Sequence, residues 1–213
     1  MSIDLARSTA ALMVVLILTG CGAAGVQTAE ELNASYDAAL ARTAAAAVEL
    51  PGGDEGPRAT LAAIEQMLAD PAPETVRARV RAVYAPDAYL NDNLAAVEGG
   101  DTIADYFVHA VGNVQAFGLE VLDLSHRGSD YFVRWRMTIT STRLHDGAPM
   151  ISYGVTHFRF DASGRVLLHK DFWDAGTGLY EYIPGVRGLI RRVRAAALPE
   201  WFVAHYRFAK QGA

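Results

Sequence analysis

From residue 116 onward, apolar residues recur at every second position, which is the period of a β-strand with one buried face. Four such stretches follow one another: FGLEVLDLSHR, DYFVRWRMTITSTR, MISYGVTHFRF and RVLLHKDFW. Their connectors, RGSD, LHDGAP and DASG, are rich in the glycine, aspartate and serine that are typical of hairpin turns. The sequence therefore predicts a long antiparallel meander that ends at Trp173.

The region before the meander has a helical period instead. ATLAAIEQMLAD places Leu61, Ile64 and Leu68 on one face, and PETVRARVRAVY repeats the pattern with valines. A short strand, AYLND, follows, and GGDTIADYFVHAV then predicts a third helix with Asp101 as its N-cap. Helices followed by an antiparallel sheet indicate an α+β fold, in which the helices pack on one face of the sheet.

The N-terminus predicts a secretion signal. An apolar run from Ala10 to Leu18 is too short to span a bilayer but suits the core of a signal peptide. The sequence LTGC after it resembles a bacterial lipobox, and its Cys21 is the only cysteine, which excludes an internal disulfide. The resemblance implies that residues 1–20 are a lipoprotein signal peptide and that Cys21 carries a lipid such as palmitate.

A protein anchored in this way is expected to face the periplasm from the cell envelope. We prefer the outer membrane, because Gly22 rather than an aspartate retention signal follows the cysteine. The alternatives are a plain secretory signal and a short membrane anchor, in both of which Cys21 has no role.

Two further segments flank the predicted domain. In residues 21–57, an alanine-rich helical pattern over 29–49 ends at PGGDEGP, so we expect a tether and a peripheral helix. Residues 177–213 predict a basic amphipathic extension, since residues 183–213 hold six Lys or Arg residues and one acid. Such a helix suits either a membrane interface or a cover over an apolar face of the domain. The net charge of −5 argues against nucleic-acid binding.

Three stretches of the central region carry a family resemblance. YAPDAYLND (84–92), GGDTIADYF (99–107) and THFRFDASGRVLLHKDFWD (156–174) follow one another in a characteristic order. They resemble three segments of the nuclear-transport-factor-2-like superfamily, especially of its SnoaL-like and ketosteroid-isomerase-like members. The resemblance, which we extend over residues 58–176, implies a cone-shaped α+β fold. A curved antiparallel sheet would wrap around the N-terminal helices and leave a pocket, with extra helices at both ends of the chain.

The stretch LLHKDFWDAG (167–176) places a histidine and an aspartate on the same strand face as a tryptophan. The resemblance implies that this face points into the cone, and it puts Asp92 where isomerase members carry their general-base carboxylate. The candidate catalytic residues are therefore Asp92, His169 and Asp171. The residues expected to line the pocket are Tyr89, Asn91, Trp135, Thr156, Phe158 and Trp173.

Three functions remain open. The first is a lipid-anchored domain that binds a hydrophobic small molecule, such as an acyl or polyketide-like compound, in its pocket. The second is an isomerase, hydrolase or cyclase, because burial favours the protonated form of a carboxyl group and lets Asp92 act as a base, assisted by His169 and Asp171. The third is a scaffold lipoprotein that forms a homodimer through its outer sheet face, where we place Arg134 and Arg136.

Several observations restrict the enzymatic alternative. Gln66 or Leu68, together with Thr156, stand where isomerase members have two oxyanion donors, so steroid-type isomerisation is not expected. Asp92 alternatively caps the turn after its strand, and His169 and Asp171 alternatively satisfy only each other. No cofactor or metal is expected, since strand parity turns His157 outward and no ligand pair has a recognised spacing.

Overall fold

The computed structural model describes residues 25–69, 72–112, 114–141, 143–199 and 202 of the 213-residue chain. Cys21 and residues 203–213 lie outside the described residues. The helices are α2 (Ala29–Thr43), α3 (Glu55–Ala69), α4 (Pro73–Val83), α5 (Gly100–Val111), η1 (His145–Gly147), α6 (Ala175–Gly178), η2 (Tyr180–Tyr182) and α7 (Val186–Ala196). The strands are β1 (Tyr84–Asn91), β2 (Ala96–Glu98), β3 (Ala116–Arg127), β4 (Asp130–Thr140), β5 (Met150–Phe160) and β6 (Val166–Trp173).

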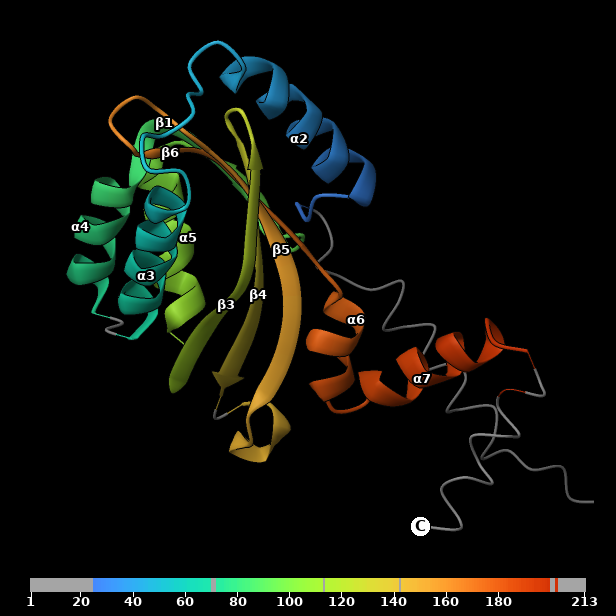
Figure 1. Cartoon of the computed structure of the whole chain (residues 1–213). Helices are drawn as coiled ribbons and strands as arrows, with labels where there is room; N and C mark the ends of the chain where they lie inside the picture. Colours follow the sequence, from blue (N-terminus) through green and yellow to red (C-terminus); the bar gives the residue numbers. More distant parts are fainter. Residues whose placement is uncertain (1–24, 70–71, 113, 142, 200–201, 203–213) are drawn as a thin grey trace, which may run out of the picture.

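The strands form one curved sheet in the order β2-β1-β6-β5-β4-β3 (Figure 1). Strands β3 to β6 pair antiparallel in sequence, which confirms the predicted meander. Strand β1 pairs parallel with β6, so the sheet is mixed. Helices α3, α4 and α5 lie on one face of the sheet and α2 lies on the other (Figure 1). The predicted α+β class, with further helices at both ends, is confirmed.

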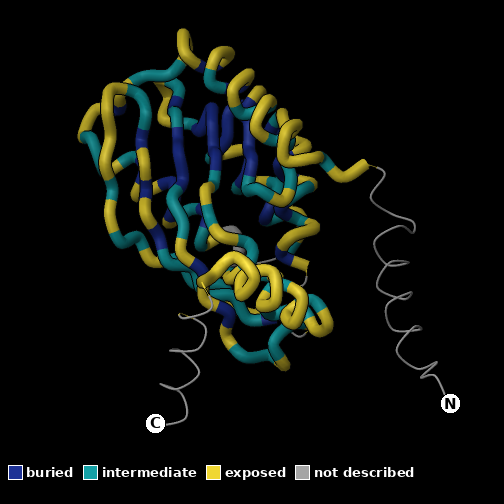
Figure 2. Tube along the Cα trace, turned by 90° about the vertical axis from the view of Figure 1, so that its right-hand side faces the viewer, coloured by how far each residue is buried: buried dark blue, intermediate teal, exposed yellow. Residues whose placement is uncertain are grey.

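The main core lies between helices α3 to α5 and the inner face of the sheet. Val76 and Val80 of α4 and Ile103 of α5 are fully buried there, together with Leu90 and Phe160 from the strands. Each such side chain stabilises the fold by about 1.5–3 kcal/mol relative to exposure in water. Buried positions concentrate along the central strands, whereas α2 and α7 are mostly exposed or half-buried (Figure 2).

Two of the sequence-based helix predictions need correction. The helix predicted over 29–49 ends at Thr43, because Val48 instead donates its backbone N–H to Phe160 and forms a β-bridge to the sheet. The predicted N-cap Asp101 lies inside the first turn of α5, and Gly99 is the N-cap, with a φ of 87° that favours glycine.

Helix α2 is held to the outer face of the sheet by a polar cluster. His157 of β5 bonds Tyr36 of α2 through Nδ1 and Asp130 of β4 through Nε2, both at 2.8 Å. Arg159 donates to Asp130 at 2.6 Å and to the carbonyl of Leu40 in α2 at 2.7 Å. His157 therefore faces outward, as strand parity predicts.

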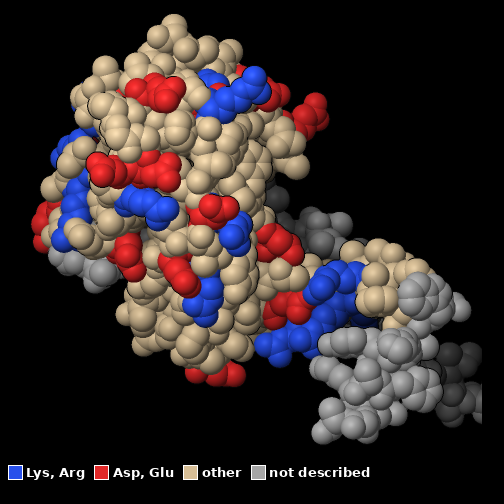
Figure 3. All heavy atoms as spheres, viewed as in Figure 1, with Lys and Arg blue, Asp and Glu red and all other residues tan. Residues whose placement is uncertain are grey.

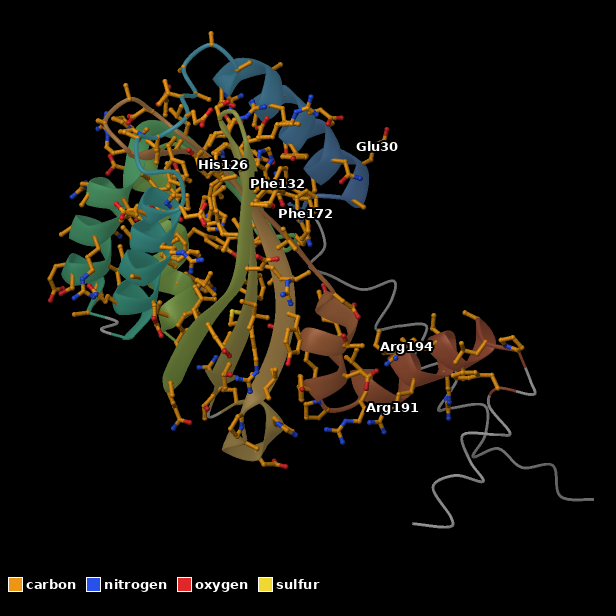
Figure 4. The ribbon with its side chains drawn as sticks, in the orientation of Figure 1. Glu30, His126, Phe132, Phe172, Arg191 and Arg194 are labelled. Carbon is orange, nitrogen blue, oxygen red and sulfur yellow. The ribbon has the colours of Figure 1, made fainter. Side chains whose placement is uncertain are left out.

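Aromatic rings flank this cluster and complete the contact. Phe132 stacks on the ring of His157 with 4.5 Å between centroids, and Phe172 meets the edge of Tyr36 at 5.7 Å. Figure 4 shows both phenylalanines near α2. The helix that the sequence assigns to the periphery thus closes part of the outer sheet face.

Acid is expected to weaken the docking of α2. Burial lowers the pKa of His157 below its ordinary value of 6.5, so below that pH the unfolded chain binds a proton that the folded chain resists. This contribution to stability is complete above pH 6.5 and is lost as the pH falls through the lowered pKa. We expect the free energy of unfolding, measured with urea, to fall between about pH 7.5 and 5.5.

The control for this prediction is His157→Gln, whose side chain has no charge to gain. Burial alone would raise the pKa of Asp130, but its bonds to Arg159 and His157 outweigh burial and lower it below 3.8, outside the tested range. The variant is expected to be less stable than the natural chain at pH 7.5 and to show a smaller pH dependence. An equally steep dependence in the variant would contradict the assignment to His157.

Candidate functional site

A cavity of about 420 Å³ lies between the inner face of the sheet and helices α3 and α5. Its volume falls in the range of about 300–1,000 Å³ that is common for small-molecule sites. Most of its wall is apolar. The apolar side chains include Leu61, Ile64, Leu90, Phe107, Phe117, Leu119, Met137, Ile139 and Met150. Gly178 and Leu179, which follow β6, complete the wall.

Polar side chains from neighbouring strands form a hydrogen-bond chain in this wall. Tyr84 O–H lies 2.8 Å from His169 Nδ1, and His169 Nε2 lies 3.1 Å from Asp171 Oδ1. Thr156 donates to the same oxygen of Asp171 and accepts the indole N–H of Trp135 at 2.8 Å. The chain therefore joins three strands of the sheet, β4, β5 and β6, to the residue that begins β1.

The direction of these bonds follows from Tyr84. Burial, together with the charge of Asp171, raises the pKa of Tyr84, so its hydroxyl stays protonated and donates to His169 Nδ1. A neutral imidazole then carries its hydrogen on Nε2 and donates it to Asp171. Both nitrogens of His169 are consequently occupied by the protein itself.

Asp171, in contrast, has one oxygen that forms no hydrogen bond with the described part of the chain. The bonds from Thr156 and His169 both end on Oδ1, and within the described part of the chain no donor reaches Oδ2. The side chain lines the cavity and retains 18% exposure. Oδ2 is not among the buried atoms that lack a partner in the described part of the chain, so it is accessible from the cavity and is the atom that this wall offers to a ligand or to water.

Asp92 is satisfied on both of its oxygens. Oδ1 accepts the backbone N–H groups of Leu94 and Ala95 at 2.9 and 3.0 Å, and Oδ2 accepts the hydroxyl of Tyr106 from α5. Burial and then the charge of Asp92 raise the pKa of Tyr106, which therefore remains a donor. Asp92 thus caps the turn after β1, which is one of the alternatives from the sequence, while it also lines the cavity.

A buried lysine holds the Asp92 turn from the opposite face of β6. Lys170 Nζ donates to Asn91 Oδ1 at 2.9 Å and also to Asn93 Oδ1. Asn93 has a φ of 72° and donates to the carbonyl of Trp173 at 3.3 Å. The indole N–H of Trp173 in turn donates to the carbonyl of Asp92 at 2.7 Å. Burial lowers the pKa of Lys170, and these contacts fix the position of the turn.

The structure brings most of the sequence-predicted site residues together. The cavity is lined by Asp92, Trp135, Thr156, His169, Asp171 and Trp173. The catalytic roles assigned to Asp92, His169 and Asp171 stay predictions. Tyr84 and Tyr106, which orient His169 and Asp92, were not among the predicted site residues, although helical spacing already places Tyr106 beside Phe107 on the apolar side of its helix.

Three of the predicted pocket residues lie elsewhere. The prediction that Tyr89 and Asn91 line the pocket is wrong, because side chains alternate along β1 and Leu90 points inward. Tyr89 instead bonds Ser35 of α2 and Asn91, both at 2.8 Å, on the outer face. Phe158 points inward but is fully buried against His169, with 4.7 Å between ring centroids, and does not reach the cavity.

The described residues contain no group of three or more His, Cys, Asp or Glu side chains that could hold a metal ion. None of the described helices combines the length and the apolar character needed to cross a membrane.

Comparison with known proteins finds likenesses for the central part of the chain. Residues 74–169 match the family model of the SnoaL-like domain. A SnoaL-like structure from Shewanella putrefaciens CN-32 has a TM-score of 0.50 and 17% identity, covering 61% of this chain and 94% of that one. TsrD from Streptomyces laurentii has a TM-score of 0.50 and 16% identity, covering 63% and 97%.

A third structure, an LEH-like epoxide hydrolase from M. tuberculosis, has a TM-score of 0.46 and 17% identity over 62% of this chain and 93% of that one. At these identities, the likeness to solved structures concerns the fold alone. No sequence among the curated proteins matches the chain.

Proposed function

We propose that this chain, which contains a SnoaL-like domain of the nuclear-transport-factor-2-like fold, binds an apolar small molecule that carries one hydrogen-bond donor. The observation that supports the proposal is a cavity of about 420 Å³ whose apolar wall includes the unpaired Oδ2 of Asp171. An apolar ligand gains free energy by leaving water, and a hydroxyl or amine N–H gives Oδ2 the partner that it lacks.

The hydrogen bonds among the polar groups of the cavity support ligand binding better than they support catalysis. Both oxygens of Asp92 and both nitrogens of His169 are already engaged within the protein. A general base must reach the proton that it removes from a substrate. If the site catalyses a reaction, as an isomerase, hydrolase or cyclase would, Asp171 is therefore a better candidate base than Asp92.

We also propose that the domain is anchored by a lipid on Cys21 and faces the periplasm. The support is the LTGC sequence and the apolar run before it. The helix α2 begins at Ala29, only a few residues after Cys21, so an anchored chain would hold the domain close to the membrane. The cavity counts against a purely scaffolding role, because a scaffold has no need of an open cone. A homodimer through the outer sheet face stays a prediction.

Filling the cavity is expected to weaken ligand binding strongly without unfolding the chain. Met137 lines the cavity, whereas Thr138 is the next residue of β4 and faces the opposite side of the sheet. We expect Met137→Trp to weaken binding of the neutral fluorescent amine N-phenyl-1-naphthylamine at least about tenfold, since the indole occupies its space. The measurement is a fluorescence titration, with circular dichroism to verify folding.

Thr138→Trp is the matched control and is expected to bind the probe like the natural chain. Equal affinity of the two tryptophan variants would contradict the proposal. So would a natural chain that fails to bind the probe at all.

A further inference from the structure

Helix α7 (Val186–Ala196) presents an apolar stripe that the described part of the chain covers only in part. Helical spacing places Val186, Leu189, Ile190 and Val193 on one face. Leu189 is 48% exposed and Val193 is 60% exposed, and no residue of the helix is buried. Figure 1 shows α7 extending away from the sheet and the helices that pack on it. An apolar stripe of this kind, exposed on a projecting helix, indicates a surface that meets a partner.

The remaining faces of α7 are strongly basic. Its arginines are Arg187, Arg191, Arg192 and Arg194, and they form the basic cluster on this part of the molecule in Figure 3. Glu181 of η2 is 3.3 Å from Arg191 Nε, also pairs with Arg194, and accepts from Arg187 through its carbonyl at 2.9 Å. Arg191 and Arg194 are labelled in Figure 4. The carboxylate of Glu181 thus pairs with two of the four guanidinium groups, and the helix keeps an excess of positive charge.

We propose that α7 lies on the surface of a bilayer that contains anionic lipids. A helix with an exposed apolar stripe bordered by arginines has the profile of an interfacial helix, with its apolar side in the boundary between head groups and acyl chains. Guanidinium groups bind phosphate in a bidentate manner, and a basic residue near an anionic surface adds about fivefold in affinity. The short helix lies along the membrane and does not cross it.

This surface also adjoins the cavity. Gly178 and Leu179 line the cavity, and η2 followed by residues 183–185 connects them to α7. A docked α7 would therefore bring one wall of the cavity next to the bilayer, which can supply an apolar ligand. This last step rests on the proposed function, whereas the contact between α7 and the membrane does not.

The test uses a fluorescent label whose emission reports the polarity around it. In the full chain with Cys21→Ser, the label is attached to Val193→Cys or to Ala195→Cys, which lies on the opposite side of the helix. The labelled proteins are mixed with vesicles of phosphatidylcholine alone or with about 30% phosphatidylglycerol. We expect a blue shift at position 193 only with the anionic vesicles, and little change at position 195.

A charge variant and a salt titration complete the test. Arg192→Glu is expected to lower the affinity for anionic vesicles at least about fivefold, and high salt is expected to weaken binding further. Because both labels report from the same chain, attachment through the N-terminal segment does not produce the difference between positions 193 and 195. No shift at position 193, equal shifts at both positions, or an unchanged shift without anionic lipid would overturn the proposal. A chain that shows the shift but binds no N-phenyl-1-naphthylamine would remove the ligand proposal and leave the membrane contact standing.

Discussion

Asp171→Asn is expected to weaken the binding of N-phenyl-1-naphthylamine by about 10- to 100-fold, because a hydrogen bond to a charged group contributes about 1.5–3 kcal/mol. Asparagine keeps an oxygen that accepts from Thr156 and His169, so the hydrogen-bond chain in the wall survives. The free Oδ2 becomes an amide NH₂ group, which donates and therefore cannot accept the N–H of the probe. The fluorescence titration that detects the cavity also measures this change.

Asp174→Asn is the matched control. Asp174 follows β6 directly, but its carboxylate caps α6 by accepting the backbone N–H of Gly176 at 2.8 Å, and it does not line the cavity. Asparagine is an equally good N-cap, so this variant loses the same charge without losing the cap. We expect its affinity for the probe to match that of the natural chain. Equal affinities of the two asparagine variants would show that Oδ2 of Asp171 does not bind the ligand.

Gly154→Ala is expected to destabilise the fold by about 1–3 kcal/mol, the usual cost of overpacking a core. A Cβ at this position of β5 would lie 2.3 Å from Cζ2 of Trp135, so the indole would have to move. Its N–H would then leave Thr156, which also donates to Asp171. We therefore expect weaker probe binding together with a lower free energy of unfolding, measured with urea.

Gly118→Ala is the control for this substitution. Gly118 is a strand residue of β3, and an added Cβ would have no atom within 4 Å. The free energy of unfolding of the Gly118→Ala chain is expected to stay within about 0.5 kcal/mol of that of the natural chain. A Gly154→Ala chain as stable as Gly118→Ala would show that the indole of Trp135 is not confined by the glycine.

The strands could be predicted from the sequence because a period of two is a local property of the chain. The stretch MISYGVTHFRF coincides with β5, Met150–Phe160, at both ends. The parallel pairing of β1 with β6 joins residues about 80 positions apart, and no local pattern carries that information. Helix α2 was recognised, but its docking depends on Tyr36 meeting His157 across the sheet, which is equally non-local.

About the same share of the candidate site as of the fold could be predicted from the sequence. The alternation along β6, with the family resemblance, gave the inward direction of His169, Asp171 and Trp173, and all three line the cavity. The same alternation applied to β1 would have turned Tyr89 and Asn91 outward. The occupied oxygens of Asp92 and the free oxygen of Asp171 depend on side chains that meet only in the folded chain.

The sequence of the C-terminal extension allowed two roles, a cover over the domain and a membrane interface, and different parts of the extension suit each role. Gly178 and Leu179 help to close the cavity, whereas α7 further along leaves its apolar stripe exposed. The amphipathic pattern predicted the helix and its two faces. The part of the extension that covers the domain ends at η2. Gly185, with a φ of 83°, then turns the chain before α7 begins.

Native mass spectrometry of the purified full-length protein tests most directly whether the cone holds a small apolar molecule. The cavity predicts that the natural chain and Thr138→Trp each carry one additional small mass, which organic extraction removes, and that Met137→Trp carries none. If the natural chain shows only the mass of the protein itself under non-denaturing conditions, or if the Met137→Trp chain keeps the additional mass, the assignment of this cavity as a ligand site is contradicted.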